Sequence, residues 1–350
     1  MAEFNTLNIK SITKETDKAV TLSFVVPSHL KNNYTFIAGQ YITLKTTING
    51  QEIRRDYSLC SSPKSGELKV AVKAVENGIF SNYANAKLET GDILEVSTPQ
   101  GRFKFEPDAN KSRHIAAFVA GSGITPVLSI AKSILEEEPN SEFVLVYGNK
   151  SLKDTMFLQE LLDLQHNYTS RLHIQFLYSQ SDEDNAIFGR IEESTVNLIL
   201  KDKFKHVAFN DFYLCGPEGM INNVTDVLKA NNIAEANIHF ELFKAAKNAP
   251  KNKVITTGET QITVIVDDDA ETFTMSKKDT ILEAAIDKDL DAPYSCQGGI
   301  CSSCIARVKE GTAEMTQNSI LTDAEVAEGL IITCQAHPTS ETITIDYDDV

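Results

Sequence analysis

Short runs in which apolar and polar positions alternate fill the first hundred residues, as expected of β-strands with one buried face. The runs cover 20–26, 41–48, 67–75 and 92–98, and Gly, Asn and Pro turns separate them. Strands at this spacing predict an antiparallel β-barrel or sandwich.

From about residue 112 the pattern changes, because strand-like apolar runs begin to alternate with helical periodicity. Strands are expected at 114–120, 142–147, 171–178, 211–215 and 237–243, and helices at 126–138, 154–165, 191–200 and 218–231. This order predicts an α/β domain with a doubly wound parallel sheet.

A polar, lysine-rich stretch without periodicity, residues 244–260, predicts a linker. After it come a predicted hairpin at 261–275, a helix at 280–290 and strands at 305–308 and 342–347. Thr322 and Glu325 form the signature of a capping box for one more short helix, which Gly329 would end. Residues 261–350 are therefore expected to form a small α+β domain.

The composition is that of globular protein, with 42% hydrophobic and 23% charged residues. No basic segment followed by an apolar core opens the chain, and no apolar run approaches the roughly 20 residues that span a bilayer. Cys60 and Cys215 lie in unrelated segments, which fits a reducing compartment. We expect a cytoplasmic protein without a membrane partner.

The net charge of −16 is concentrated near the C-terminus, where residues 261–350 contain 18 acidic and 5 basic side chains. Such a surface would repel a phosphate backbone, so a nucleic-acid partner is not expected. Two explanations of the acidity stay open: it serves solubility, or it forms a docking face that steers a basic electron acceptor.

Four cysteines in the acidic segment carry the clearest chemical signal. Three stand as C-x4-C-x2-C and the fourth follows thirty residues later; they are Cys296, Cys301, Cys304 and Cys334. This is the spacing of a plant-type [2Fe–2S] site. Small residues between them would let backbone N–H groups approach the sulfurs. The alternatives are unliganded surface thiols and a zinc site. A zinc site would more often show two C-x2-C pairs, and only one is present.

Two glycine turns that precede predicted helices are candidate phosphate sites. In the turn 121–126 the glycines let the backbone approach a ligand, Thr125 would cap the helix and Pro126 suits its first turn. Gly78 would break a strand, and Ser81 would begin a helix whose amides could hold a second phosphate. A purely structural turn is the alternative for a Gly-x-Gly pattern alone.

Two further motifs complete the set. At 54–58 an Arg-Arg-Asp-Tyr-Ser run ends a predicted strand, and these side chains could neutralise a phosphate, stack on a flat ring and donate a hydrogen bond. An edge strand with solvated arginines is the alternative. Residues 213–220 again run from a strand through a Gly-Pro turn into a helix.

In their order, these motifs resemble the ferredoxin–NADP reductase superfamily. Its patterns R-x-Y-S, G-x-x-S, G-x-G-x-x-P and C-G-P-x-x-M occur here as Arg55–Ser58, Gly78–Ser81, Gly121–Pro126 and Cys215–Met220. With a ferredoxin-like C-terminal domain, the resemblance covers essentially the whole chain. Stretches 147–150, 241–243 and 330–335 are similar to reductases of multicomponent oxygenases.

The resemblance implies a fold and an activity. Residues 1–110 would be an FAD-binding barrel, 111–243 an NAD(P)-binding α/β domain, 244–260 a linker and 261–350 a β-grasp [2Fe–2S] domain. The implied activity is an NAD(P)H-dependent oxidoreductase that passes electrons through FAD and the cluster to an oxygenase protein. An oxygenase of ring-hydroxylating or alkane type is one alternative acceptor. A redox-sensing module is a different class, which has no need of a hydride donor.

The resemblance also implies roles for individual residues. The implied FAD set is Arg55, Tyr57, Ser58, Val72, Lys73, Gly78, Ile79, Phe80 and Ser81. The implied nucleotide set is Gly121, Ser122, Gly123, Thr125, Pro126, Lys150, Cys215, Gly216, Pro217 and Met220. The implied catalytic residues, where the nicotinamide meets the flavin, are Thr125, Cys215, Glu241 and Phe243. Outside the resemblance, Cys215 and Phe243 would be ordinary core residues.

One departure concerns the hydride donor. Lys150 stands where the family commonly has an Arg that helps to hold the 2′-phosphate of NADPH, and Gln180 follows Ser179 in place of another Arg. Lys binds phosphate as a point charge without the bidentate fork. NADPH is therefore expected, with NADH left open.

Overall fold

The computed structural model describes residues 3–243 and 257–350. The chain divides into a larger unit, Phe4–Phe243, and a smaller C-terminal unit that begins at Lys244. Residues 244–256 of the expected linker lie outside the described residues, and the first strand after them begins at Glu259, two residues earlier than expected. Within the described part of the chain, no helix combines the length and the apolar character needed to cross a membrane.

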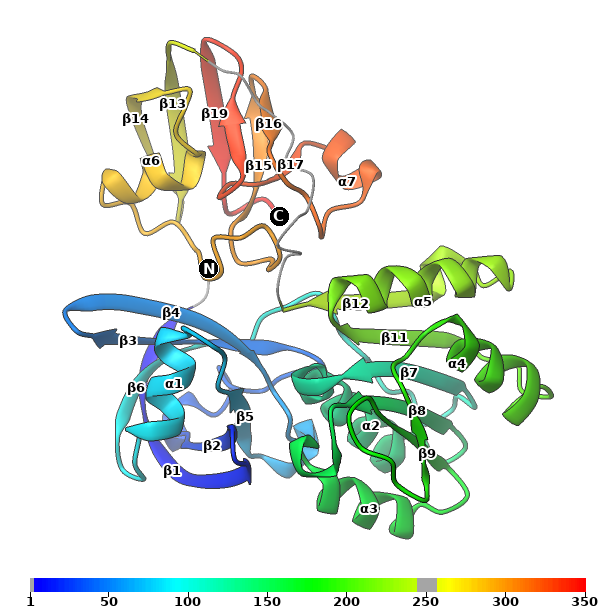
Figure 1. Ribbon diagram of the computed structural model, residues 1–350. Helices are drawn as coiled ribbons and strands as arrows, with labels where there is room; N and C mark the ends of the chain where they lie inside the picture. The colour runs from blue at the N-terminus through cyan, green and yellow to red at the C-terminus, as the bar shows by residue number, and fades with distance from the viewer. Residues whose placement is uncertain (1–2, 244–256) are drawn as a thin grey trace. The chain divides into compact units, whose positions relative to one another are not determined.

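The larger unit begins with an antiparallel six-stranded sheet in the order β4-β3-β6-β1-β2-β5 (Figure 1). Its strands are β1 (Phe4–Thr16), β2 (Ala19–Val25), β3 (Tyr41–Ile48), β4 (Gln51–Ser58), β5 (Leu68–Lys73) and β6 (Ile93–Ser97). A bridge between Leu59 and Val70 joins the end of β4 to β5, so the sheet curls into an open barrel. One helix, α1 (Ile79–Ala86), follows β5. The predicted antiparallel barrel is confirmed.

A parallel six-stranded sheet completes the larger unit, in the order β10-β9-β8-β7-β11-β12. Its strands are β7 (His114–Ala120), β8 (Glu142–Asn149), β9 (Leu172–Tyr178), β10 (Ala186–Phe188), β11 (Asp211–Gly216) and β12 (Ile238–Leu242). The helices are α2 (Ile124–Glu137), α3 (Leu158–Asn167), α4 (Glu193–Leu198) and α5 (Glu218–Ala230). In Figure 1, α2 and α3 cover one face and α5 the other, which is the predicted doubly wound arrangement.

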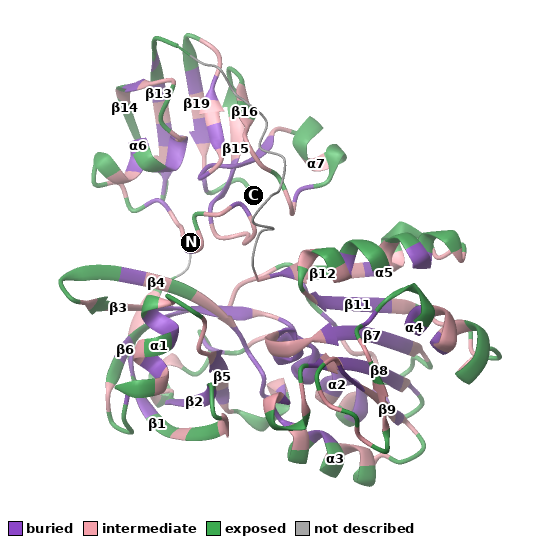
Figure 2. Cartoon of the chain, viewed as in Figure 1, coloured by how far each residue is buried: buried purple, intermediate pink, exposed green. Residues whose placement is uncertain are grey.

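The chain enters this sheet in its middle. It runs outward from β7 through β8 and β9, then returns to place β11 on the other side of β7. The carboxyl ends of β7 and β11 therefore flank a topological switch point, where sheets of this kind bind their ligands. The central strands are buried along almost their whole length, as Figure 2 shows in purple.

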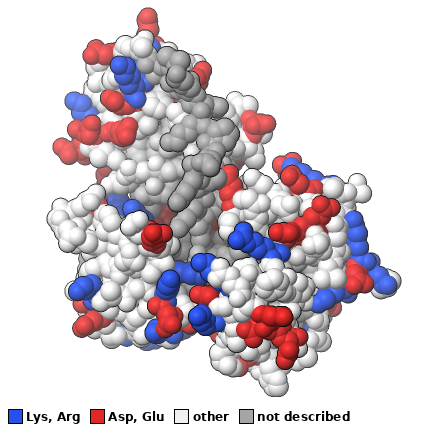
Figure 3. Space-filling view, viewed as in Figure 1, with Lys and Arg blue, Asp and Glu red and all other residues white. Residues whose placement is uncertain are grey.

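The C-terminal unit has a five-stranded mixed sheet, β14-β13-β19-β15-β17, and a two-stranded ribbon, β16-β18. Its elements are β13 (Glu259–Val266), β14 (Asp269–Ser276), α6 (Ile281–Asp287), β15 (Ile305–Glu310), β16 (Ala313–Met315), α7 (Asp323–Ala327), β17 (Leu330–Ile332), β18 (Ala336–Pro338) and β19 (Thr342–Asp346). Among the described strands of the five-stranded sheet, only β13 and β19 pair in parallel. Capping boxes begin both helices, at Thr280 and at the predicted Thr322. This is the expected β-grasp domain. Figure 3 shows Asp and Glu side chains spread over the drawn face of this domain.

Side chains of α2 fasten the barrel to the parallel sheet within the larger unit. Ser129 Oγ donates to the carbonyl of Ser61 at 2.7 Å, and Lys132 Nζ donates to the carbonyl of Cys60 at 3.0 Å. Both acceptors lie on the barrel segment that follows β4. The barrel and the sheet are thus held in one relative position.

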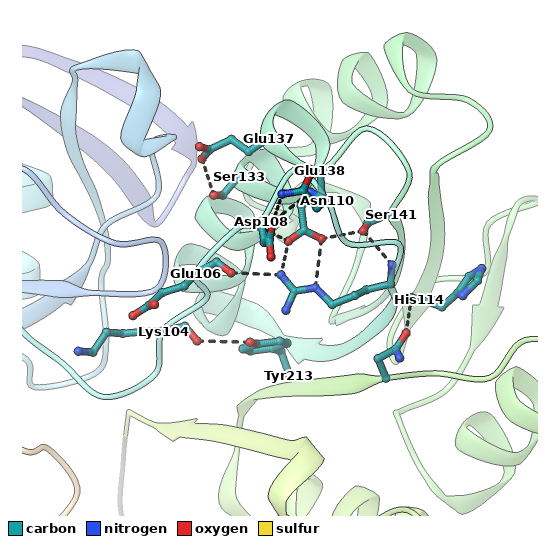
Figure 4. A network of polar contacts seen from close by, with 12 residues as sticks. Lys104, Glu106, Asp108, Asn110, His114, Ser133, Glu137, Glu138, Ser141 and Tyr213 are labelled. Atoms are coloured by element: carbon teal, nitrogen blue, oxygen red, sulfur yellow. Dashed lines mark hydrogen bonds and ion pairs between the residues drawn. The ribbon is translucent and has the colours of Figure 1, made fainter.

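A buried ion pair reinforces this junction where the chain passes from the barrel to β7. The side chain of Glu138 is fully buried, and it accepts hydrogen bonds from Arg113, from Ser141 Oγ at 2.6 Å and from the backbone N–H of Asp108 at 2.8 Å. Figure 4 shows Glu138 at the centre of this network. Burial alone would raise the pKa of Glu138, but the bonds from Arg113 and Ser141 outweigh it, so the pKa lies below its ordinary value.

Candidate functional site

The glycine turn after β7 lies directly against the end of β11. A Cβ on Gly123 would overlap the backbone carbonyl of Cys215, so only glycine fits there. A Cβ on Gly216 would lie 2.8 Å from Met220 Cε and 3.2 Å from the backbone nitrogen of Ala120. The Gly121–Gly123 and Cys215–Pro217 turns therefore pack directly against each other at the switch point, where sheets of this kind bind their ligands.

One expectation about this turn is wrong. Thr125 does not cap α2, because it lies inside the helix and Gly123 occupies the capping position. The turn Gly121–Gly123 is already helical, so the helix begins before Thr125. The buried Thr125 hydroxyl instead donates to the carbonyl of Ser122 at 3.1 Å. Pro126 falls in the first turn of α2, as expected.

Three of the sequence-predicted residues meet across the larger unit. Cys215 on β11 pairs in register with Glu241 on β12, and Ser58 Oγ of the barrel donates to Glu241 Oε2 at 3.1 Å. Ser58 and Glu241 are 183 residues apart in the chain. The packing of the barrel on the sheet thus brings Ser58, Cys215 and Glu241 together.

The protonation of this group follows from burial. Cys215 is fully buried, and burial raises the pKa of its thiol well above the ordinary value. Burial also raises the pKa of Glu241 to about 8, against the opposing hydrogen bond from Ser58. At neutral pH both groups are predominantly protonated, so together they present an uncharged polar wall.

The second candidate phosphate turn, Gly78–Ser81, lies at the start of α1. A Cβ on Gly78 would overlap Ser81 Oγ and lie 2.6 Å from Val75 Cγ2. Ser81 does not begin the helix as expected; it is the third residue of α1, with Gly78 at the capping position. Its hydroxyl accepts from the backbone N–H of Val75 at 3.3 Å and so ties the turn together. Phe80 of the same turn is buried, whereas Ile79 is exposed.

Aromatic and basic side chains flank this turn on the barrel. The rings of Tyr57 and Phe80 lie 5.5 Å apart, and burial raises the pKa of Tyr57, which keeps its hydroxyl protonated. Arg55 is exposed on β4 and donates to the carbonyl of Arg54 at 2.6 Å. The side chain of Val72 is fully buried, so only its backbone could face a ligand.

Lys73, a member of the implied FAD set, lies beside the Gly121–Gly123 turn. Lys73 Nζ lies 3.8 Å from the position that a Cβ of Gly121 would occupy. Burial lowers the pKa of Lys73, the positive charge of Lys150 lowers it further, and Asp154 opposes both. Lys73 and Lys150 therefore bring two cationic groups from the barrel and the sheet to one place. No local pattern could reveal this, because it depends on how the two sheets pack. Phe243, the last described residue of the larger unit, packs against its core.

In the C-terminal unit the four cysteine thiols fall into two pairs. Cys296 is hydrogen bonded to Cys301, and Cys304 is hydrogen bonded to Cys334. Four cysteine side chains are the ligand set that would hold a [2Fe–2S] cluster, and here they lie as two adjacent pairs. In the ranges 3–243 and 257–350, no three His, Cys, Asp or Glu side chains gather around a single ion position.

The surroundings of the thiols also fit a cluster. Gly298 N–H donates to Cys296 Sγ at 3.3 Å, and the hydroxyl of the buried Ser295 has no partner among the described residues. Gly299 has a φ of +71°, and a Cβ there would lie 2.9 Å from Gln335 Cγ. Gln335 closes over the loop by donating to the carbonyl of Gln297 at 3.3 Å. Donors thus face the sulfurs as a negatively charged cluster requires, and the residues present fit the group.

Family models match most of the chain. An oxidoreductase FAD-binding domain matches residues 6–105, an oxidoreductase NAD-binding domain matches 118–226, and a 2Fe-2S iron-sulfur cluster binding domain matches 264–339. These cover the barrel, the parallel sheet and the C-terminal unit in turn.

Known relatives and a solved structure match this chain over almost its whole length. The chain is 36% identical over 351 residues to one of the subunits of 1,2-phenylacetyl-CoA epoxidase from Escherichia coli (strain K12), covering 99% of each protein. It is 31% identical to the ferredoxin reductase component of 3-ketosteroid-9-alpha-monooxygenase from Rhodococcus rhodochrous, covering 97% of this chain and 96% of that protein. The structure of phthalate dioxygenase reductase matches with a TM-score of 0.62 and 26% identity over 98% of each chain.

The fold and the site define a flavin- and nucleotide-dependent electron-transfer reductase. The chain belongs to the ferredoxin–NADP reductase-like family whose members carry a C-terminal [2Fe–2S] ferredoxin domain. It is an NAD(P)H-dependent oxidoreductase with FAD and a [2Fe–2S] cluster as its cofactors.

Proposed function

We propose that this chain is the reductase component of a phenylacetyl-CoA epoxidase and supplies its oxygenase with electrons during phenylacetate degradation. The observation that carries the proposal is the 36% identity over 99% of both chains with a protein of that epoxidase. An oxygenase protein is then the partner that takes the electrons.

The proposed site in the larger unit has two parts. FAD is held by the Arg55–Ser58 strand end, the backbone of Val72 and Lys73 and the Gly78–Ser81 turn. NAD(P)H lies on the Gly121–Pro126 and Cys215–Met220 turns, beside Lys150. When bound there, FAD would supply the chemistry of accepting a hydride and passing on single electrons.

Within this site the protein's own residues position the nicotinamide and keep the surrounding wall uncharged. Gly123, pressed against Cys215, leaves backbone on which the nicotinamide can lie. The nicotinamide and flavin rings meet at a wall formed by Thr125, Cys215, Glu241 and Phe243. The hydrogen bond from Ser58 fixes Glu241 in that wall. The predominantly protonated Glu241 and Cys215 add no charge that would repel an electron-rich ring.

The proposal predicts which oxygenase the chain serves. Mixed with the oxygenase components that epoxidise phenylacetyl-CoA, the purified protein should support NADPH-dependent product formation, whereas ring-hydroxylating or 3-ketosteroid oxygenases should give little. A higher rate with one of those would assign the chain to that oxygenase instead.

A matched variant separates the electron-transfer route from a sensing role. Cys301→Ser should abolish reduction of a protein acceptor such as cytochrome c while NADPH-dependent ferricyanide reduction by the flavin persists. Cys60→Ser, in the barrel, is the control and should keep both. If Cys301→Ser loses both activities equally, the cluster is not the route by which electrons leave.

The preferred donor is proposed to be NADPH, with Lys150 at its 2′-phosphate. Lys150→Ala should lower kcat/KM for NADPH about tenfold and leave that for NADH nearly unchanged, because only NADPH carries the extra phosphate. Lys153→Ala is the neighbouring control. Equal kcat/KM for both donors in the parent protein would contradict the preference.

A further inference from the structure

A chain of buried hydrogen bonds reaches the cysteine site from the last strand of the C-terminal unit. Tyr347 Oη donates to Thr333 Oγ1 at 2.9 Å, and Thr333 Oγ1 donates to the backbone carbonyl of Cys304 at 2.8 Å. The backbone N–H of Thr333 donates to the same carbonyl at 3.0 Å. Thr333 is fully buried and Tyr347 is 3% exposed.

The geometry fixes which way each hydroxyl points. The Cys304 carbonyl can only accept a hydrogen bond, so the Thr333 hydroxyl must donate its single proton to it. That leaves the Thr333 oxygen as an acceptor for the proton of Tyr347. The carbonyl of Thr333 accepts from the backbone N–H of Leu282, in the first turn of α6, at 3.2 Å. Thr333 is therefore held at all three of its polar atoms.

The position of Thr333 connects this series of hydrogen bonds to the cysteines. It directly precedes Cys334 and bonds directly to Cys304, so it joins the two members of one thiol pair that stand thirty residues apart in the sequence. Tyr347 in turn is anchored to the sheet, since its backbone N–H donates to the carbonyl of Ile265 at 3.0 Å. One line of contacts thus runs from the rigid sheet to the cysteine pair.

We propose that Thr333 and Tyr347 are positioning residues for the cluster: Thr333 sets the spacing and carbonyl orientation of the Cys304–Cys334 pair, and Tyr347 holds the Thr333 hydroxyl in its donating direction. Groups that orient metal ligands in this way commonly alter metal affinity by 10–100-fold. The inference concerns only the cluster domain and does not depend on which oxygenase receives the electron.

The test uses the full-length protein with its cofactors. Thr333→Val keeps the shape of the side chain but removes the hydroxyl, and Tyr347→Phe removes only the terminal donor. We expect cluster loss in the presence of an iron chelator, followed by visible absorbance, to become about tenfold faster in Thr333→Val and to rise less in Tyr347→Phe. The midpoint potential of the cluster should fall in the same order, with altered g-values in the EPR spectrum of the reduced protein.

Two variants distinguish positioning from simple packing. Thr333→Ser restores the hydroxyl without the methyl group, so it should return the potential and EPR spectrum to those of the parent. Thr263→Val removes a hydroxyl that bonds Thr272 on the exposed side of the same sheet, and it should change neither. NADPH-dependent ferricyanide reduction should stay constant throughout, because the flavin site lies in the other unit.

Several outcomes would overturn the proposal. Parental potential and EPR spectra in both Thr333→Val and Tyr347→Phe would do so, even if their thermal stability fell. So would a Thr333→Ser variant that behaves like Thr333→Val, since the methyl group would then be the part that matters. If Thr333→Val fails to fold, the midpoint potential and EPR spectrum of Tyr347→Phe decide the question: values equal to those of the parent protein would overturn the proposal.

Discussion

The buried carboxylate at the junction of barrel and parallel sheet allows a quantitative prediction. Glu138→Gln preserves size and shape but removes the charge that balances Arg113. The carboxylate accepts four hydrogen bonds, two on each oxygen: Asp108 N–H and Arg113 on one, and Ser141 Oγ and Arg113 on the other. An amide has one acceptor oxygen, so two of the four donors would face an N–H group instead.

The size of the effect follows from this loss. Breaking a buried ion pair by removing one partner costs about 3–5 kcal/mol, and each stranded buried donor costs about 1–3 kcal/mol. Because Gln retains half of the acceptors and Arg113 keeps a bond to the carbonyl of Glu106 at 3.1 Å, we expect about 2–4 kcal/mol. With a urea slope of about 3 kcal/mol per molar, the unfolding midpoint should fall by about 1 M.

Urea titration with flavin fluorescence as the signal measures this midpoint, because the network lies within the unit that carries the flavin site. The cluster absorbance of the same sample is an internal reference and should keep its midpoint. Glu235→Gln is the matched control: its pair with Lys229, at 3.0 Å, lies on the surface, with the Glu235 side chain 81% exposed. Such pairs contribute about 0–1 kcal/mol. If Glu138→Gln and Glu235→Gln shift the flavin midpoint equally, the network does not hold the junction.

Further predictions concern the flavin–nucleotide site. Glu241 has a folded-state pKa of about 8, so the folded protein binds more protons than the unfolded chain between about pH 4.3 and 8, and its stability should fall as pH rises through that window. Glu241→Gln should flatten this part of a melting-temperature profile, and an unchanged slope would show that another group titrates. Gly123→Ala should reduce the rate of flavin reduction in stopped-flow experiments by at least about 100-fold, because its Cβ would overlap the Cys215 carbonyl. An unchanged rate of flavin reduction in Gly123→Ala would disprove the close approach of Gly123 to Cys215.

Much of the fold could be predicted because the information is local. The run at 114–120 matches β7 residue for residue, since a buried parallel strand is apolar along its length. β1 was missed because its strand of thirteen residues buries only Leu7 and Ile9 and so has no continuous alternation. The helix expected from residue 154 begins at Leu158, because Phe157 adopts a left-handed φ of +58° that no local pattern marks.

The candidate site likewise has features that local sequence reveals and features that depend on tertiary packing. The cysteine spacing could be recognised because three of the four cysteines lie in one short stretch of sequence, at the intervals typical of a [2Fe–2S] site. The contact between Ser58 and Glu241, the approach of Lys73 to Gly121 and the bond from Thr333 to Cys304 join segments that only tertiary packing brings together. Motifs identified those segments singly, but the sequence held no signal for the pairings.

The bond between Ser58 and Glu241 has a consequence for how the protein is made. The barrel leaves the ribosome first and has its own core, yet the carboxyl group that accepts from Ser58 is made 183 residues later, on the last described strand of the larger unit. At about 5–20 residues per second, Glu241 follows Ser58 by roughly 10–40 s. The bond from Ser58 to Glu241 can therefore form only after the entire parallel sheet has been synthesised.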